Sequence, residues 1–294
     1  MEVTAAAVKE LRERSGAGMM ECKKALVQNN GDMEAAIDWL RTQGLAKADK
    51  KSSRVTAEGR LAMAVSGNEA IVVELNCETD FVAKDESFVA FAEAVAKAAL
   101  AGKTGDIEAI KLLPTDAGTV EERRLALVAK IGENIQIRRT AHVTAPTLGI
   151  YLHGTRIAVL VSMTGGSEEL ARGIAMHIAA INPSYLNMDQ VPAEAFEREK
   201  QIALEQSKDS GKPADIVEKM IVGKIRKTLG DQTLLGQPYS GPNSDGKQTV
   251  EDLLKAAKAT VTAFTRMAVG EGIEKKQEDF AAEVMAQVEA SKKQ

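Results

Sequence analysis

The sequence predicts an α+β fold, in which an N-terminal helical module precedes a core of two α/β subdomains with antiparallel sheets. Up to about residue 46, apolar residues recur at helical spacing, and from Thr56 short β-branched runs between turn residues replace that pattern. In addition, a hairpin followed by a helix occurs twice, from Leu61 and again from Leu148. We therefore expect two similar subdomains, although their sequence identity is too low to indicate a duplication.

Residues 1–46 are expected to form a compact three-helix module, similar to a ubiquitin-associated domain. The expected helices are separated by turns that contain Gly or Asn, and they span 4–14, 19–28 and 33–42. Thr4 caps the first helix in this prediction, and Gly44 ends the third. The polar residues 47–55 have little to pack against and are expected to be a linker.

Gly16 and Gly18, at the first turn of this module, invite comparison with a phosphate-binding loop. Such a loop follows a strand and continues to a further glycine or to Gly-Lys-Ser/Thr, whereas here a helix precedes it and Met19 and Met20 follow. A turn between helices is therefore the favoured interpretation. The two methionines either pack inward, which is the usual case, or offer an adaptable surface to a partner.

Residues 56–142 are expected to form the first subdomain of the core. Its predicted strands lie at 61–65, 71–73 and 134–139, and its predicted helices at 87–101, 106–113 and 119–131. Gly67 belongs to the hairpin turn, Pro114 ends the short helix, and Thr119 with Glu122 forms a capping box for the last helix.

The second subdomain is expected over 143–183 and 229–269, and a C-terminal module over 270–294. Strands are predicted at 148–153, 157–163 and 261–269, and helices at 168–181, 249–259 and 278–290. The segment 184–228 is an insertion with two charged amphipathic helices, which predict a projecting helical hairpin, an antiparallel coiled coil. This hairpin either folds back on the core or contacts another chain, most simply a second copy.

The composition favours a protein partner over nucleic acid or membrane. The chain has 294 residues, of which 44% are hydrophobic, and a formal net charge of −4, so it lacks the positive charge on which non-specific nucleic-acid binding depends. Cys22 and Cys77 form no CxxC pair, which fits a reducing compartment. Neither a signal peptide nor a membrane-spanning run is evident, so we expect a cytoplasmic protein.

The sequence contains no recognisable catalytic or metal-binding constellation. His142, His153 and His177 are scattered, and none stands at metal-ligand spacing from Cys, Asp or Glu. Motifs of serine hydrolases, zinc proteases and kinases are absent from the sequence. We therefore expect no enzyme, no metal and no cofactor. His153, beside Gly154 at a turn, is a candidate surface contact.

A polar corner between a predicted strand and helix carries the least expected residue. Phe81 lies there beside Asp80, after the apolar run that ends at Leu75 and before the helix that begins near Ser87. Phe81 either turns inward and fills the junction, or is presented outward as a wedge for a partner. Local rules leave both possibilities open.

Four stretches of the chain resemble the elongation factor Ts family of translation. They are ELNCETDFVAK at 74–84, LRERSGAGMMECKKAL at 11–26, GENI at 132–135 and GEGIEK at 270–275. Glu21 stands where the family commonly has Asp, a change that keeps the charge. The stretches are co-linear and extend over essentially the whole chain, so the resemblance is specific.

The resemblance implies guanine-nucleotide exchange on the GTPase elongation factor Tu. Phe81 and Asp80 would enter between helices of the GTPase domain, shift the region that holds Mg²⁺ and loosen GDP, while Thr79 and Val82 would hold the corner. It implies further partner contacts at Arg12, Gly16, Met19, Met20, His153 and Ile273. In family members that dimerise, the helical hairpin would mediate the contact and give a 2:2 complex.

Two other classes of function stay open at this point. A protein-binding scaffold could recruit a client through the N-terminal module without any exchange activity, and nucleotide-release kinetics distinguish it from an exchange factor. A nucleotide-binding enzyme would bind GDP or ATP by itself, which we do not expect.

Overall fold

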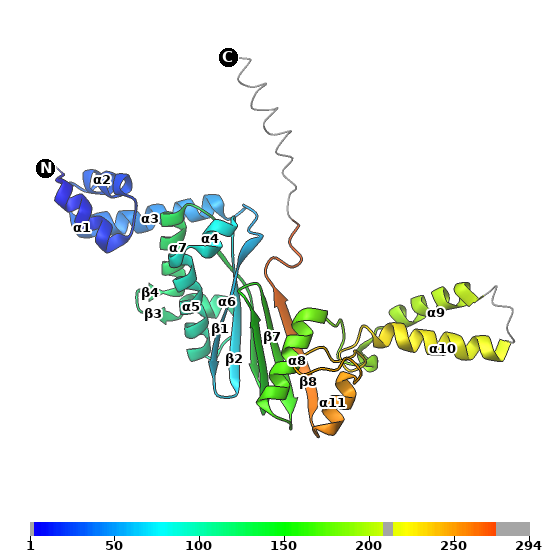
Figure 1. The fold of residues 1–294 in the computed structure, drawn as a ribbon. Coiled ribbons are helices and arrows are strands. Elements are labelled where there is room, and N and C mark those ends of the chain that lie inside the picture. Colours follow the sequence, from blue (N-terminus) through cyan, green and yellow to red (C-terminus); the bar gives the residue numbers. More distant parts are fainter. Residues whose placement is uncertain (1–2, 208–213, 275–294) are drawn as a thin grey trace, which may run out of the picture.

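The computed structural model describes residues 3–207 and 214–274, and the N-terminal module in it is helical as predicted (Figure 1). Its helices are α1 (Ala5–Ser15), α2 (Met19–Gln28) and α3 (Met33–Lys51). Their shared core consists mainly of small and aliphatic side chains, namely Val8, Leu11, Ala17, Cys22, Ala25, Leu26 and Ala36. Thr4 caps α1, because its side chain accepts a hydrogen bond from the Ala7 amide.

The prediction that the third helix ends at Gly44 is wrong, because α3 continues to Lys51 and takes in the first half of the expected linker. A β-carbon on Gly44 would lie 3.7 Å from that of Ala129 on α7 (Val120–Ile131), so α3 packs closely on α7 at this point. Lys51 Nζ then donates to the Gly132 carbonyl at 2.6 Å. Packing on the core therefore outweighs the weak helix propensity of glycine.

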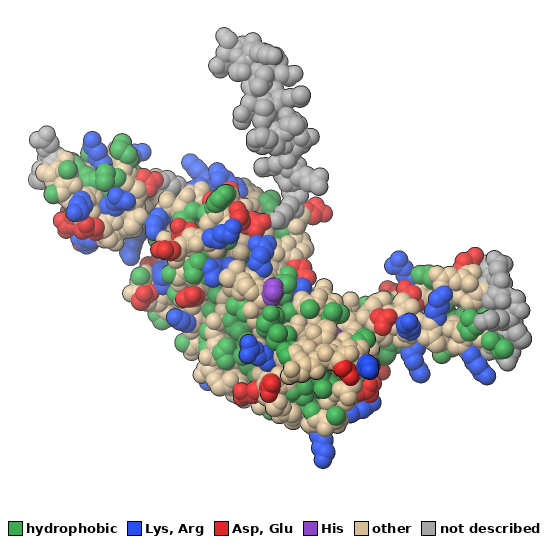
Figure 2. Space-filling model, viewed as in Figure 1, with side chains coloured by type: hydrophobic (Ala, Val, Ile, Leu, Met, Phe, Trp, Pro, Cys, Tyr) green, Lys and Arg blue, Asp and Glu red, His purple; other side chains and the backbone are tan. Residues whose placement is uncertain are grey.

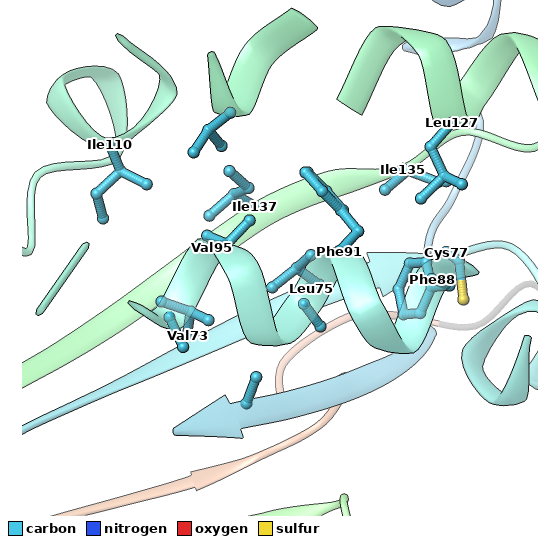
Figure 3. Close-up of a cluster of buried hydrophobic side chains, with 14 of the residues drawn as sticks. Val73, Leu75, Cys77, Phe88, Phe91, Val95, Ile110, Leu127, Ile135 and Ile137 are labelled. Carbon is cyan, nitrogen blue, oxygen red and sulfur yellow. The ribbon is translucent and has the colours of Figure 1, made fainter. Parts of the chain in front are cut away.

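The first subdomain is a three-stranded antiparallel sheet covered on one face by helices. The sheet has the order β1 (Glu58–Ser66), β2 (Glu69–Cys77), β5 (Gln136–Thr144), and α5 (Glu86–Ala101) and α7 lie on it (Figure 1). Side chains of β2, α5 and α7 meet in one buried cluster, which Figure 3 shows around Leu75, Phe88, Phe91 and Leu127. The predicted hairpin and the capping box of Thr119 and Glu122 are both confirmed.

Four short elements complete this subdomain. The predicted short helix is α6 (Ile107–Leu112). The strands β3 (Pro114–Thr115) and β4 (Gly118–Thr119) form a small ladder that was not predicted, because two residues are too few for an alternating pattern. The corner after β2 is a short helix, α4 (Asp80–Lys84), instead of a loop.

The second subdomain repeats this plan, with the sheet order β6 (Thr147–His153), β7 (Ile157–Thr164), β8 (Thr260–Ala268). α8 (Glu168–Ile181) packs on one face, and α11 (Val250–Ala256) ends three residues earlier than predicted. The central strands β2 and β7 are buried on both faces, since the two sheets also pack on each other through a shared cluster: Leu61, Ala70, Val72, Ala145, Leu148, Ala158, Leu160 and Met267.

The insertion projects from the second subdomain as two helices that lie side by side (Figure 1). After a short 3₁₀ turn, η1 (Met188–Gln190), these are α9 (Ala193–Ser207) and α10 (Ala214–Gly230), which bury Ala203, Ile221 and Ile225 between them. The predicted alternative in which the hairpin folds back on the core is wrong. The residues between these two helices, 208–213, and the expected helix at 278–290 lie outside the described residues.

Candidate functional site

The candidate site is built on α4, the single short helix that follows β2. Thr79 is its N-cap residue, and its hydroxyl accepts a hydrogen bond from the Val82 amide at 3.4 Å. Val82 and Ala83 on the inner side of α4 belong to the buried cluster of the first subdomain. The inner face of the corner is therefore part of the core, and only its outer face is free to meet a partner.

Phe81 lies on that outer face and is 81% exposed, more than any other large apolar side chain among the described residues. The inward alternative is therefore wrong, and the prediction of an exposed Phe81 is confirmed. Within α4, Val82 and Ala83 face the core, whereas Asp80, Phe81 and Lys84 are exposed.

Asp80 is also exposed and is paired with a lysine one helical turn away. Its carboxylate accepts a hydrogen bond from Lys84 Nζ at 2.7 Å. The Lys84 ammonium holds the pKa of Asp80 below its usual value, so the side chain is ionised at neutral pH. The corner thus presents an apolar ring beside a carboxylate that already has a cationic partner.

Two glutamates hold the chain that enters α4. Glu133 Oε2 accepts hydrogen bonds from the Glu78 and Thr79 amides, both at 3.0 Å, and its Oε1 accepts one from the Thr79 hydroxyl at 2.6 Å. Glu78 Oε1 in turn accepts from the Asn134 amide at 2.7 Å. The sequence showed Glu133 only as part of a motif. Its role was missed because it lies 54 residues from Thr79.

The partner-contact residues predicted in the N-terminal module lie around the turn between α1 and α2. Gly16 is the C-cap of α1 in the left-handed conformation, with its amide donating to the Arg12 carbonyl at 2.8 Å. Met19 and Met20 are 54% and 77% exposed, so they do not pack inward. Gly16 and Met20 also line a groove of about 830 Å³ between this module and the helices α5 and α7.

His153 and Ile273 lie at the same end of the two sheets as the corner. His153 pairs with Ile157 across the β6–β7 hairpin, and Ile157 pairs with Ala268 at the end of β8, shortly before Ile273. Arg156 in the same hairpin binds Glu58 at 2.9 Å. Glu58 is the partner of Cys77 in the first sheet, two residues before Thr79. Strand register therefore brings these residues to one end of the core.

Buried titratable groups are structural in this fold. Within the described residues, no three His, Cys, Asp or Glu side chains gather as a metal site. His177 is buried and lies between Ser240 and Gln237, at 3.0 Å and 2.9 Å. Burial, together with nearby carboxylates, raises the pKa of the Cys77 thiol to about 12, so this cysteine is a poor nucleophile.

Charges of both signs are mixed on the surface. Lys and Arg alternate with Asp and Glu over the face seen in Figure 2, without a broad basic area. In the part of the chain that the structure describes, every helix is too short or too polar to cross a membrane.

Comparison with known proteins gives one consistent result. The family model described as "Elongation factor TS" matches residues 78–271. The chain is 59% identical over 291 residues to "Elongation factor Ts" of Xanthomonas oryzae pv. oryzae, with 98% of this chain and 99% of the relative covered. It is 56% identical over 292 residues to "Elongation factor Ts" of Xylella fastidiosa, with the same coverage of both chains.

Proposed function

The chain belongs to the elongation factor Ts family, and we propose that it acts on its partner through the outer face of α4. It is a nucleotide exchange factor for elongation factor Tu in translation elongation, and not a catalytic enzyme. The observation that carries the proposal is Phe81, a bulky apolar ring that is 81% exposed on a corner whose inner face is core.

In the proposed mechanism, Phe81 enters the GTPase domain of elongation factor Tu as a wedge. Mg²⁺ and the phosphate-binding amides provide much of the charge stabilisation of a bound nucleotide, so a shift of the region that holds them weakens GDP binding. Asp80 supplies negative charge and hydrogen bonds at the contact, while Thr79 and Val82 hold the corner. The coupling is reciprocal, so GTP binding in turn releases the factor.

The remaining predicted contacts extend the partner-binding surface beyond α4. We propose that Arg12, Gly16, Met19 and Met20 contact the partner from the N-terminal module. His153 and Ile273 would do so from the end of the sheets, in line with their place beside the corner. Distributed contacts of this kind supply affinity, and the wedge acts on the nucleotide site.

We further propose the division of the chain that the sequence indicates. The units are a ubiquitin-associated type module at 1–46, a linker at 47–55 whose first half is the end of α3, subdomains at 56–142 and at 143–183 with 229–269, an inserted coiled coil at 184–228, and a C-terminal module at 270–294. The protein would work in the cytoplasm, without a cofactor.

The projecting hairpin is our candidate for a contact between copies. Apolar side chains remain partly exposed along it, namely Phe196, Ile202, Leu204, Ile216, Met220 and Val222. A homodimer through this surface would give a 2:2 complex with elongation factor Tu. Sedimentation of the wild type and of the double variant Met220→Glu, Val222→Glu tests this dimer. If the dimer depends on this surface, the variant should sediment as a monomer.

Stopped-flow release of fluorescent GDP from elongation factor Tu tests the wedge. Phe81→Ala should slow release by about 30-fold or more, the size expected for a central aromatic worth about 2 kcal/mol. Leu112→Ala is the matched control, because Leu112 is 76% exposed on α6 and takes no part in the proposed site. Equal release with both variants would contradict the wedge, and no acceleration by the wild type would favour a scaffold.

A further inference from the structure

The loop after α7 joins three segments that are far apart in sequence. Glu133 binds the chain entering α4, and Asn134 Nδ2 donates to the carbonyls of Ser52 and Arg54 at 3.2 Å and 3.0 Å. Ser52 and Arg54 directly follow α3, the last helix of the N-terminal module. This loop therefore touches both the Phe81 corner and the end of the module.

The contact between Glu133 and the corner is built from several charge-assisted hydrogen bonds. The Glu133 carboxylate accepts hydrogen bonds from two successive amides and from the hydroxyl of Thr79, the residue that caps α4. Hydrogen bonds to an ionised acceptor are shorter and stronger than neutral ones. Three donors on one carboxylate fix the position of Thr79 and the direction in which α4 leaves it.

A second carboxylate makes the contact reciprocal. Glu78 accepts from the Asn134 amide at 2.7 Å and binds Arg54 at 3.3 Å, so each segment holds the other by its backbone. Asn134 is only 2% exposed, whereas Thr79 and Asp80 are exposed. The loop is thus the anchored side of the contact, and the corner is the side that is held.

The exposed position of Thr79 indicates what its hydrogen bonds with Glu133 contribute. Both hydrogen bonds from Thr79 to Glu133 are exposed and the one from the Glu78 amide is partly buried, so water can replace Glu133 at least at Thr79 when it is lost. What disappears is the fixed direction of α4 and of the Phe81 ring on it. A wedge that moves freely has to be ordered in the step that loosens GDP, and this ordering takes free energy from that step.

We propose that Glu133 is a positioning residue for nucleotide exchange, which aims Phe81 without touching the partner's nucleotide site. This inference rests on the proposed function of Phe81. It predicts that Glu133 affects the rate of GDP release at saturation more than the affinity for elongation factor Tu. It also predicts that Glu133 matters only while Phe81 is present.

The experiment measures GDP release against the concentration of the full-length factor. Glu133→Ala should lower the maximal release rate about tenfold and leave the half-saturating concentration within about twofold, since distributed contacts set affinity. Glu133→Gln, which keeps one oxygen for the two amides, should give an intermediate rate. In the Phe81→Ala background, Glu133→Ala should cause little further loss, as expected for residues that act as one unit.

Asp252→Asn is the matched control in the second subdomain. Asp252 accepts from the amide and hydroxyl of Thr249, the N-cap of α11, and so resembles Glu133 at Thr79. This variant should exchange like the wild type, and an equal loss would show general destabilisation and overturn the proposal. An equal fold-loss from Glu133→Ala with or without Phe81, or a change in half-saturation alone, would overturn it too. If wild type fails to accelerate release, the proposed function itself is wrong.

Discussion

Replacing Glu74 by Gln is expected to weaken the contact between the two sheets at the end where the site lies. Glu74 on β2 is fully buried on the face toward the second sheet, and its carboxylate accepts from the Gly270 amide at 2.8 Å, just after β8. Arg138 and Arg139 both bind it as well. Neighbouring strand residues normally point to opposite faces, but a register shift opposite Glu74 allows both guanidinium groups to reach it.

The size of the effect follows from the burial of Glu74. Burial alone would raise the pKa of this carboxyl, but hydrogen bonds from Gly270, Arg139 and Asn76 hold the pKa below its usual value. It is therefore charged at neutral pH, and breaking a buried ion pair costs about 3–5 kcal/mol. Because Gln keeps an acceptor for the Gly270 amide, we expect a loss of unfolding free energy at the lower end of this range, about 3 kcal/mol. At about 2–4 °C per kcal/mol, the melting temperature should fall by roughly 6–12 °C.

Circular dichroism during thermal and urea unfolding at neutral pH measures this change. The control is Glu271→Gln, because Glu271 pairs with the same Arg139 but is 47% exposed. An exposed pair contributes less than about 1 kcal/mol, so this variant should melt close to the wild type. If Glu74→Gln is no less stable than Glu271→Gln, the buried carboxylate does not hold the sheets together.

Two further predictions concern the same core. Gly270→Ala should cost more than Gly67→Ala in urea unfolding, because both have positive φ, but only at Gly270 would the added carbon lie 2.4 Å from the Ala57 carbonyl oxygen. Equal losses would mean that this close approach relaxes freely. Burial lowers the pKa of His177, so below its unfolded value of 6.5 the unfolded chain takes up a proton that the folded chain resists. The free energy of unfolding should therefore fall between pH 7 and pH 5, and it should fall less in His177→Gln. An equal pH dependence in the two proteins would contradict this prediction.

The parts of the fold that the sequence predicted well are those set by neighbouring residues. The capping box of Thr119 and Glu122 needs only four consecutive positions, and the hairpin of β1 and β2 follows from two apolar runs on either side of the turn at Gly67. The helix α3 was misjudged at Gly44, because the residue that favours its continuation, Ala129, comes 85 positions later and reaches it only in the folded chain. Propensity is a weak guide where tertiary packing intervenes.

For the candidate site, too, the sequence predicted only what neighbouring residues determine. Phe81 could be recognised as unusual from its polar neighbours, and only the fold decided that its ring faces outward. Glu133, which holds the chain before it, carries no local signal, since its hydrogen-bond partners Glu78 and Thr79 lie 55 and 54 residues earlier in the chain. The register shift at Arg138 is equally hidden, because a continuous strand and a bulged one have the same composition.

An exposed Phe81 has a physical rationale if its ring is used only on the partner. Burying a phenylalanine is worth about 1.5–3 kcal/mol, and in this chain most of that free energy is not spent on folding. The backbone beneath the ring is already ordered by Glu133 and by the buried Val82, so docking need not order the corner again. The free energy of burying the ring is then available to displace elements of the GTPase domain. A flexible corner with the same ring would bind with part of that energy lost to ordering, and would loosen the nucleotide less.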